Sequence, residues 1–248
     1  HYTNKVKEFA KATHQPKYYY FAWANRLVTY YLKTSRTNIA LYEVQNMLKE
    51  AQKEDDKTGL SRCYNIMSQI YTIKRFDSMA FEWRLKEIEL TEKYNIENYN
   101  ISQTYAQIAN YYISQKKQKE ALRAVEKAIS TANSSTQQIS AKLEYVNYYS
   151  KFGDFQAAEK ILKECQIAFE QDKRLESIKK RLYNIECLYY QQTRQYQKAL
   201  EAAEMQEKEE HRLSESILSS SHYRTQGEIY QKMGNMNMAV KYLQMYIN

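Results

Sequence analysis

Glycine and proline, the residues that most chain reversals require, are almost absent from this sequence. Its 248 residues include four glycines and one proline, where average usage gives roughly thirty of the two together. β-Sandwiches, barrels and hairpin meanders need a turn about every 8 to 12 residues, and dinucleotide-binding and P-loop folds need clustered glycines. The shortage therefore predicts an all-helical chain.

The charged residues describe an ordinary solvated surface. The 37 Lys and Arg and the 29 Asp and Glu give a formal net charge of +8, and both signs are interspersed along the whole chain. No stretch combines arginine with aromatic residues as an RNA-binding platform does, and no apolar run approaches the ~20 residues that span a bilayer. We expect no nucleic-acid partner through this segment and no direct membrane insertion.

A tyrosine followed nine residues later by an alanine occurs six times at a nearly fixed period. Successive alanines of these pairs are 37 to 41 residues apart. A period of this length is typical of solenoids built from stacked helix pairs. The pairs are Tyr31 with Ala40, Tyr71 with Ala80, Tyr112 with Ala121, Tyr149 with Ala158, Tyr190 with Ala199, and Tyr230 with Ala239.

The residues around each tyrosine carry a family resemblance. A small or medium residue stands three positions before it, and the turn position, four after it, reads Ser35, Arg75, Lys116, Gly153, Arg194 and Gly234. This pattern resembles the tetratricopeptide repeat, in which the tyrosine lies on the first helix (A) and the alanine begins the second (B). The resemblance implies a right-handed α-α superhelix of about six helix pairs. In the second repeat we allow a one-residue shift, because Phe76 stands one place early.

The period also divides the chain. Residues 1–16 are predicted to be the remnant helix of a preceding repeat, with Val6, Phe9 and Ala10 at helical spacing. Six repeats of about 40 residues are predicted to follow. Their approximate ranges are 17–56, 57–97, 98–134, 135–174, 175–214 and 215–248. Both ends of the chain are expected to be boundaries within a larger protein.

The resemblance places helix A on the concave wall of the superhelix, with the wall positions nine, six and two before each tyrosine and one and two after it. An asparagine amide pairs with both groups of a peptide backbone, and arginine binds carboxylates. We therefore predict a groove for an extended peptide that is acidic or has a free C-terminal carboxylate. The alternative is that a water-exposed helix face is naturally rich in such residues. The predicted binding residues are Asn25, Arg62, Asn65, Gln69, Asn110, Asn147, Lys151, Arg181, Asn184, Gln191 and Arg224.

Nothing in the sequence predicts catalysis. The four histidines are scattered, and no H-E-x-x-H, C-x-x-C or G-x-S-x-G pattern occurs, so we expect no active site, no metal and no cofactor. Cys63, Cys165 and Cys187 fall in predicted helices, where buried thiols are common. A disulfide between Cys165 and Cys187 is the alternative.

Most of the 25 tyrosines are expected in the core between helices. Tyr18, Tyr19, Tyr20 and Tyr99 lie outside the repeat positions, and we expect them to be partly exposed, since tyrosine is favoured at interfaces.

Tyrosine-rich repeats that end in Gly-Glu-Ile-Tyr-Gln-Lys-Met-Gly-Asn also resemble the sensory segment of Bacteroidetes-type membrane-anchored regulators, including two-component regulators. That resemblance implies a periplasmic, non-catalytic sensor domain of a larger signal-transduction or transcription-regulating protein, which binds a peptide or protein; a homodimer is left open. A cytoplasmic peptide-pheromone receptor of the Rap or Rgg type is one alternative. A general protein-assembly scaffold is the other.

Overall fold

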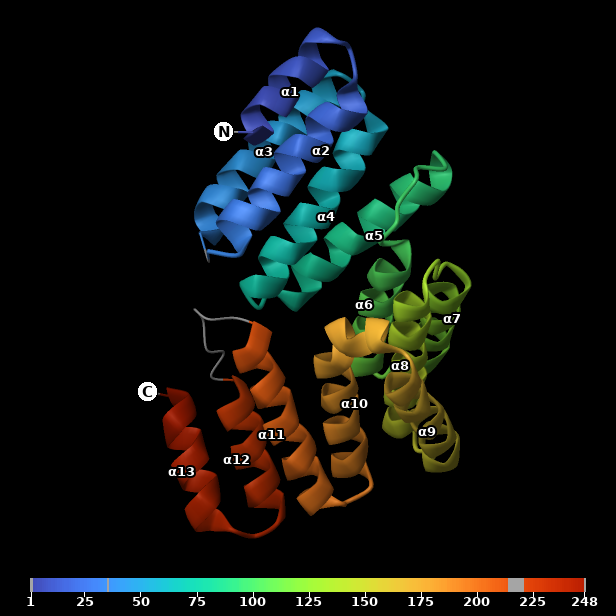
Figure 1. The fold of residues 1–248 in the computed structure, drawn as a ribbon, viewed down its shortest axis with the longest axis vertical. Helices are drawn as coiled ribbons and strands as arrows, with labels where there is room; N and C mark the ends of the chain where they lie inside the picture. The colour runs from blue at the N-terminus through green and yellow to red at the C-terminus, as the bar shows by residue number, and fades with distance from the viewer. Residues whose placement is uncertain (1, 35, 214–220, 248) are drawn as a thin grey trace. The chain divides into compact units, whose positions relative to one another are not determined.

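The computed structural model describes residues 2–34, 36–213 and 221–247, and every regular element in these ranges is a helix. The chain forms two compact units, residues 1–111 and 112–248. Figure 1 shows successive helices running antiparallel within each unit. Their bounds are α1 Tyr2–Ala12, α2 Pro16–Arg26, η1 Leu27–Leu32, α3 Thr37–Lys53, α4 Lys57–Ile73, α5 Asp77–Lys93, α6 Ile101–Ser114, α7 Gln118–Ser130, α8 Ser135–Phe152, α9 Phe155–Gln171, η2 Lys173–Ile178, α10 Lys179–Gln192, α11 Tyr196–Leu213, α12 Ser221–Lys232 and α13 Met236–Ile247.

The six tyrosine-alanine pairs mark six turns with the same backbone hydrogen bonds. In each, the N–H of the residue five after the tyrosine donates to the tyrosine carbonyl at 2.8 to 3.0 Å. The carbonyl of that residue then accepts from the alanine N–H at 2.9 to 3.1 Å. One residue thus closes helix A and begins helix B. All six alanines are at most 3% exposed. The predicted helix pairs are confirmed, and Tyr71 and Ala80 keep this geometry without a shift.

The residue four after the tyrosine takes a left-handed backbone conformation in five of these turns. Its φ is +91° at Gly153 and +77° at Gly234, and +62°, +57° and +60° at Arg75, Lys116 and Arg194; Ser35 lies outside the described residues. This conformation follows from the hydrogen bond to the tyrosine carbonyl, and glycine adopts it without steric cost. Three turns are therefore built with side chains that disfavour them.

Replacing Lys116 or Arg194 with glycine is expected to raise the free energy of unfolding by about 0.5 to 1 kcal/mol at each site. The left-handed conformation costs a non-glycine residue about 1 to 2 kcal/mol, and glycine removes that cost. Part of the gain is lost because the unfolded chain is more flexible at a glycine. Urea unfolding of each variant measures the change. Arg123→Gly, at an exposed position in the interior of α7, is the control and is expected to be destabilising by about 1 kcal/mol. Destabilisation at all three sites contradicts the prediction.

Unit 1 is held together by a core between α2, η1, α3 and α4. Its fully buried side chains include Tyr20, Leu27, Val44, Met47 and Ile70, and Figure 1 shows α2 beside both α3 and α4. The π-helical turn η1 continues α2 directly. Such turns change which side chains share a helix face, and the buried residues of η1 are Leu27, Tyr31 and Leu32.

Two expected exposures in unit 1 are wrong. Tyr19 is 7% exposed and Tyr20 is fully buried, because their rings pack in the core. Their hydroxyls donate to Glu50 of α3 at 2.7 Å and to Glu54, the residue that follows α3, at 2.8 Å. Tyr18 and Tyr99 are exposed as expected, at 55% and 67%.

Helix α1 buries only one of the three apolar residues that stand at helical spacing. Ala10 is buried in the core of unit 1, but Val6 and Phe9 are exposed. Lys7 also contacts α2, with its Nζ 3.3 Å from the centre of the Trp23 ring. A cation over an aromatic face thus contributes to the contact between α1 and α2.

In the described part of unit 2, one core cluster lies between α8, α9 and α10 and another between α10, α11 and α12. Cys165 lies in the first cluster and Cys187 in the second. These two thiols and Cys63 are buried and free, so the alternative of a Cys165–Cys187 disulfide is wrong. Burial raises the pKa of the Cys165 thiol to about 11, so this thiol is an unreactive core residue.

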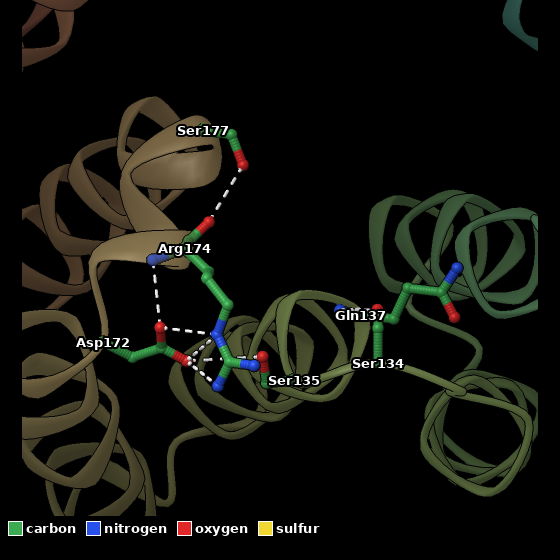
Figure 2. Close-up of polar contacts among 6 residues, drawn as sticks. All are labelled: Ser134, Ser135, Gln137, Asp172, Arg174 and Ser177. Carbon is green, nitrogen blue, oxygen red and sulfur yellow. Dashed lines mark hydrogen bonds and ion pairs between the residues drawn. The ribbon is translucent and has the colours of Figure 1, made fainter.

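Asp172 joins three segments of unit 2. Its Oδ1 accepts from the backbone N–H of Arg174 at 2.9 Å, its carboxylate pairs with the Arg174 guanidinium, and its Oδ2 accepts from Ser135 Oγ at 3.4 Å. Figure 2 shows the Asp172 carboxylate directed at the Arg174 guanidinium, with Ser135, at the start of α8, on the other side of that group. The hydrogen bonds to Arg174 hold the pKa of Asp172 down to about 2. The carboxylate therefore fixes the junction between α9 and η2 as an anion.

Asp172→Asn is expected to lower Tm above pH 5 and to have little effect near pH 2. A carboxylate with a depressed folded-state pKa stabilises the fold above its unfolded pKa of about 3.9, and that contribution is lost as the pH falls through the folded pKa of about 2. Differential scanning fluorimetry at pH 2 to 7 should give a Tm difference that narrows between pH 4 and 2. A difference independent of pH contradicts the assignment.

Candidate ligand-binding cavity

Unit 1 contains a cavity of about 600 Å³ between the A helices α2 and α4 and the connection that follows α5. Helix α2 contributes Tyr18, Phe21 and Asn25, η1 contributes Val28, and the connection contributes residues 96–100. Helix α4 supplies a polar wall, Arg62, Asn65 and Gln69, at intervals of three and four residues that align them on one helix face. The volume is in the usual range for ligand sites.

Arg62 is the charge of this cavity that has no counter-ion. No hydrogen bond or ion pair connects it to another described residue, and its Nε is buried without a hydrogen-bond partner. Its guanidinium carbon lies 5.1 Å from the centre of the Phe21 ring, so the planar group is held by an aromatic face. Burial lowers the pKa of Arg62, yet arginine stays protonated at neutral pH. The cavity thus offers a desolvated positive charge.

A buried carboxylate, Glu87 of α5, orders the amide side chains of the α4 wall. It is 2% exposed and accepts from Asn65 Nδ2 at 3.2 Å and from Asn98 Nδ2 at 2.9 Å. Burial raises the pKa of Glu87, while these amides and Arg84 favour its charged form. Asn65 Oδ1 in turn accepts from Gln69 Nε2 at 2.7 Å. The amides of this wall are therefore ordered by one carboxylate.

Of the predicted binding residues in unit 1, the cavity brings together Asn25, Arg62, Asn65 and Gln69. Asn110 lies on α6, is partly buried and does not line this cavity.

The predicted residues of unit 2 are mostly engaged by the protein itself. Arg181 forms an ion pair with Glu144, whose side chain is 1% exposed, and Arg224 pairs with Glu228 at 2.8 Å. Gln191 accepts from Lys232 Nζ at 2.9 Å. Lys151 and Asn184 are exposed, and Asn147 is partly buried. That these residues bind a ligand stays a prediction.

Sequence reasoning missed two contributors to the cavity. Glu87 lies on a B helix, which the groove pattern does not include, and residues 96–100 lie in a connection between repeats. The Arg224–Glu228 pair could have been found, because oppositely charged residues four apart share a helix face. Glu144, 37 residues from Arg181, left no such local signal.

Across the described ranges, no group of three or more His, Cys, Asp or Glu could hold a metal ion. None of the helices in those ranges has the length and apolar character that crossing a membrane requires.

No protein-family model matches the sequence, and no curated protein sequence matches it. Solved structures do match. A tetratricopeptide repeat protein from Parabacteroides merdae aligns with 99% of this chain and 91% of its own, at 15% identity and a TM-score of 0.60. The fold is therefore that of a tetratricopeptide-repeat protein. The predicted fold class, an all-α tetratricopeptide-like solenoid, is confirmed.

Two further tetratricopeptide-like neighbours extend this comparison. NprR, solved in complex with its cognate peptide NprX, aligns with 93% of this chain at 14% identity and a TM-score of 0.69. This chain spans 65% of the NprR chain. PilW, a type IV pilus biogenesis factor, aligns with 91% of both chains at 15% identity and a TM-score of 0.56. At these identities the likeness establishes the fold alone.

Proposed function

We propose that this chain is a non-catalytic binding module that receives an extended peptide, or an extended segment of a partner protein, in the unit 1 cavity. The observation that carries the proposal is Arg62, a half-buried guanidinium without a counter-ion among exposed aromatic rings and amides. A desolvated arginine is stabilised by a carboxylate in bidentate contact. The ligand is therefore acidic at the residue that enters the cavity.

The size of the cavity defines how much of the ligand enters. About 600 Å³ accommodates one or two residues, and the remainder of the peptide follows the A helices beyond it. Tyr18, Phe21 and Tyr99 are 50 to 67% exposed, and aromatic side chains at a binding surface supply large contact areas at low entropic cost. That NprR was solved with a peptide supports this mode of binding for the fold.

A selection from random N-acetylated octapeptides with free C-termini tests the proposal. The selected peptides, labelled with fluorescein, are titrated by anisotropy against the protein and two variants. Asn25→Trp fills the cavity from an exposed position and is expected to weaken binding at least tenfold. Gln45→Trp, equally exposed on α3, is the matched control and should bind as the parent does. Equal binding by both variants, or no enriched sequence, contradicts the proposal.

We further propose that this module is the sensory part of a larger signalling protein, located in the periplasm and acting through a change in helix-pair stacking or in a contact between two copies. The support is the resemblance of the tyrosine-rich repeats to such sensory segments. A cytoplasmic peptide receptor remains the second candidate, which the likeness to peptide-bound NprR favours. Reading the gene on both sides of residues 1–248 separates them: a downstream membrane helix and output domain support the sensor, whereas an upstream DNA-binding domain without a membrane helix supports the receptor.

A further inference from the structure

The polar wall of the cavity is a directed chain of hydrogen bonds. It begins at the Glu87 carboxylate, passes through the Asn65 amide and ends at the Gln69 amide. Both carboxylate oxygens of Glu87 accept from Asn65 Nδ2, so the Asn65 amide nitrogen faces Glu87. The Asn65 oxygen is then directed at Gln69, where it accepts from Nε2. The polarity of each amide follows from the one before it.

The end of this chain is the group left free for a ligand. Asn65 uses its nitrogen on Glu87 and its oxygen on Gln69. Gln69 makes no other hydrogen bond within the described part of the chain, so its Oε1 and its second N–H remain available. One acceptor and one donor side by side match the N–H and C=O of a peptide group.

We propose that Gln69, not Asn65, is the amide that binds the peptide backbone of the ligand, and that Glu87 is a positioning residue which fixes its orientation through Asn65. This inference rests on the proposed function for the peptide itself. The relay, by which we mean the hydrogen bonds from Glu87 through Asn65 to Gln69, is a property of the unliganded protein. Arg62 and Gln69 then bind different groups of the ligand: Arg62 binds its carboxylate, and Gln69 forms hydrogen bonds with the adjacent peptide group.

Glu87 also holds the far wall. Asn98 Nδ2 donates to Glu87, and Asn98 Oδ1 accepts from the Asn100 N–H at 3.0 Å. The connection that carries Tyr99 into the cavity is thus tied to the same carboxylate. One buried charge thereby sets both the polarity of the α4 wall and the position of the connection.

Side-chain amide signals in ¹H–¹⁵N NMR spectra test the relay without any ligand. Glu87→Gln is nearly isosteric but presents a donor to Asn65, and is expected to shift the Gln69 amide signals, although Glu87 and Gln69 share no hydrogen bond. In an Asn65→Ala background the same substitution should leave the Gln69 signals unmoved, because the middle link is gone. Glu144→Gln, which alters an equally buried glutamate in unit 2, is the control and should not shift the Gln69 amide signals in either background. If Glu87→Gln fails to fold, Asn65→Leu alone must shift the Gln69 signals.

N-Acetyl-L-tyrosine, which carries one carboxylate, one peptide group and one ring, is the probe for binding. Glu87→Gln and Gln69→Ala are expected to weaken it by similar factors, roughly three- to tenfold, the value of a typical hydrogen bond, with no further loss when combined. An unmoved Gln69 signal in Glu87→Gln, or an equal shift in the Asn65→Ala background, overturns the relay. An intact NMR cycle without binding of any peptide instead counts against the proposed function, so the two failures are distinguishable.

Discussion

Gly59→Ala is expected to lower the free energy of unfolding by about 1 to 3 kcal/mol, the usual cost of overpacking a core. A Cβ at this position would lie 2.8 Å from Cδ2 of Tyr20 and 2.9 Å from its Cε2 and Cγ. The ring has no room to move, because Tyr20 is fully buried and its hydroxyl is bound to Glu54. Urea unfolding of the variant measures the loss.

The background of the substitution separates steric overlap from other causes. In an isolated helix alanine is about 1 kcal/mol more favourable than glycine, and Gly59 lies in α4. With Tyr20→Leu in place, the ring is absent and Gly59→Ala should become neutral or stabilising. A destabilisation of the same size in both backgrounds contradicts the contact.

Arg62→Gln is expected to weaken binding of N-acetyl-L-tyrosine roughly ten- to hundredfold, which corresponds to the loss of a hydrogen-bonded charge pair. Binding of N-acetyl-L-tyrosinamide, which has no carboxylate, should change little. The comparison of the acid with the amide isolates the contribution of the carboxylate charge to binding, because both probes fill the cavity equally. Saturation-transfer NMR or isothermal titration measures both affinities.

The same substitution should not destabilise the protein. Arg62 is desolvated without a counter-ion, so glutamine removes a charge whose burial opposes folding. This gain offsets the lost contact with the Phe21 ring, and Tm should stay constant or rise. Lys163→Gln, which removes an exposed lysine already paired with Glu159, is the control and should leave the binding of both probes unchanged. Loss of acid and amide binding together in Arg62→Gln would indicate collapse of the cavity instead of loss of its charge.

The repeat architecture could be predicted from the sequence because its determinants are local. The tyrosine whose carbonyl ends helix A, and the alanine that begins the packed face of helix B, are nine residues apart in every repeat. The small residue expected three before the tyrosine has a visible reason in the last repeat, where a Cβ on Gly227 would lie 2.7 Å from Leu243 Cγ. Local sequence was therefore sufficient for helix pairs and their register.

The candidate site was predictable only in part, because a cavity also depends on residues from outside the repeating pattern. Arg62, Asn65 and Gln69 share one face of α4, and helical spacing alone indicates that. Glu87 and Asn98 enter the cavity through packing of α5 and its following connection, which no spacing in the sequence specifies. For the same reason Arg181 was predicted as a ligand-binding residue, although the structure pairs it with Glu144.

A crystal structure of the protein with the tightest peptide selected from the octapeptide library tests the central claim most directly. We expect a carboxylate of that peptide within about 3 Å of the Arg62 guanidinium, and the adjacent peptide group paired with the Gln69 amide. A peptide bound elsewhere on the chain, with Arg62 still without a counter-ion, would contradict the account.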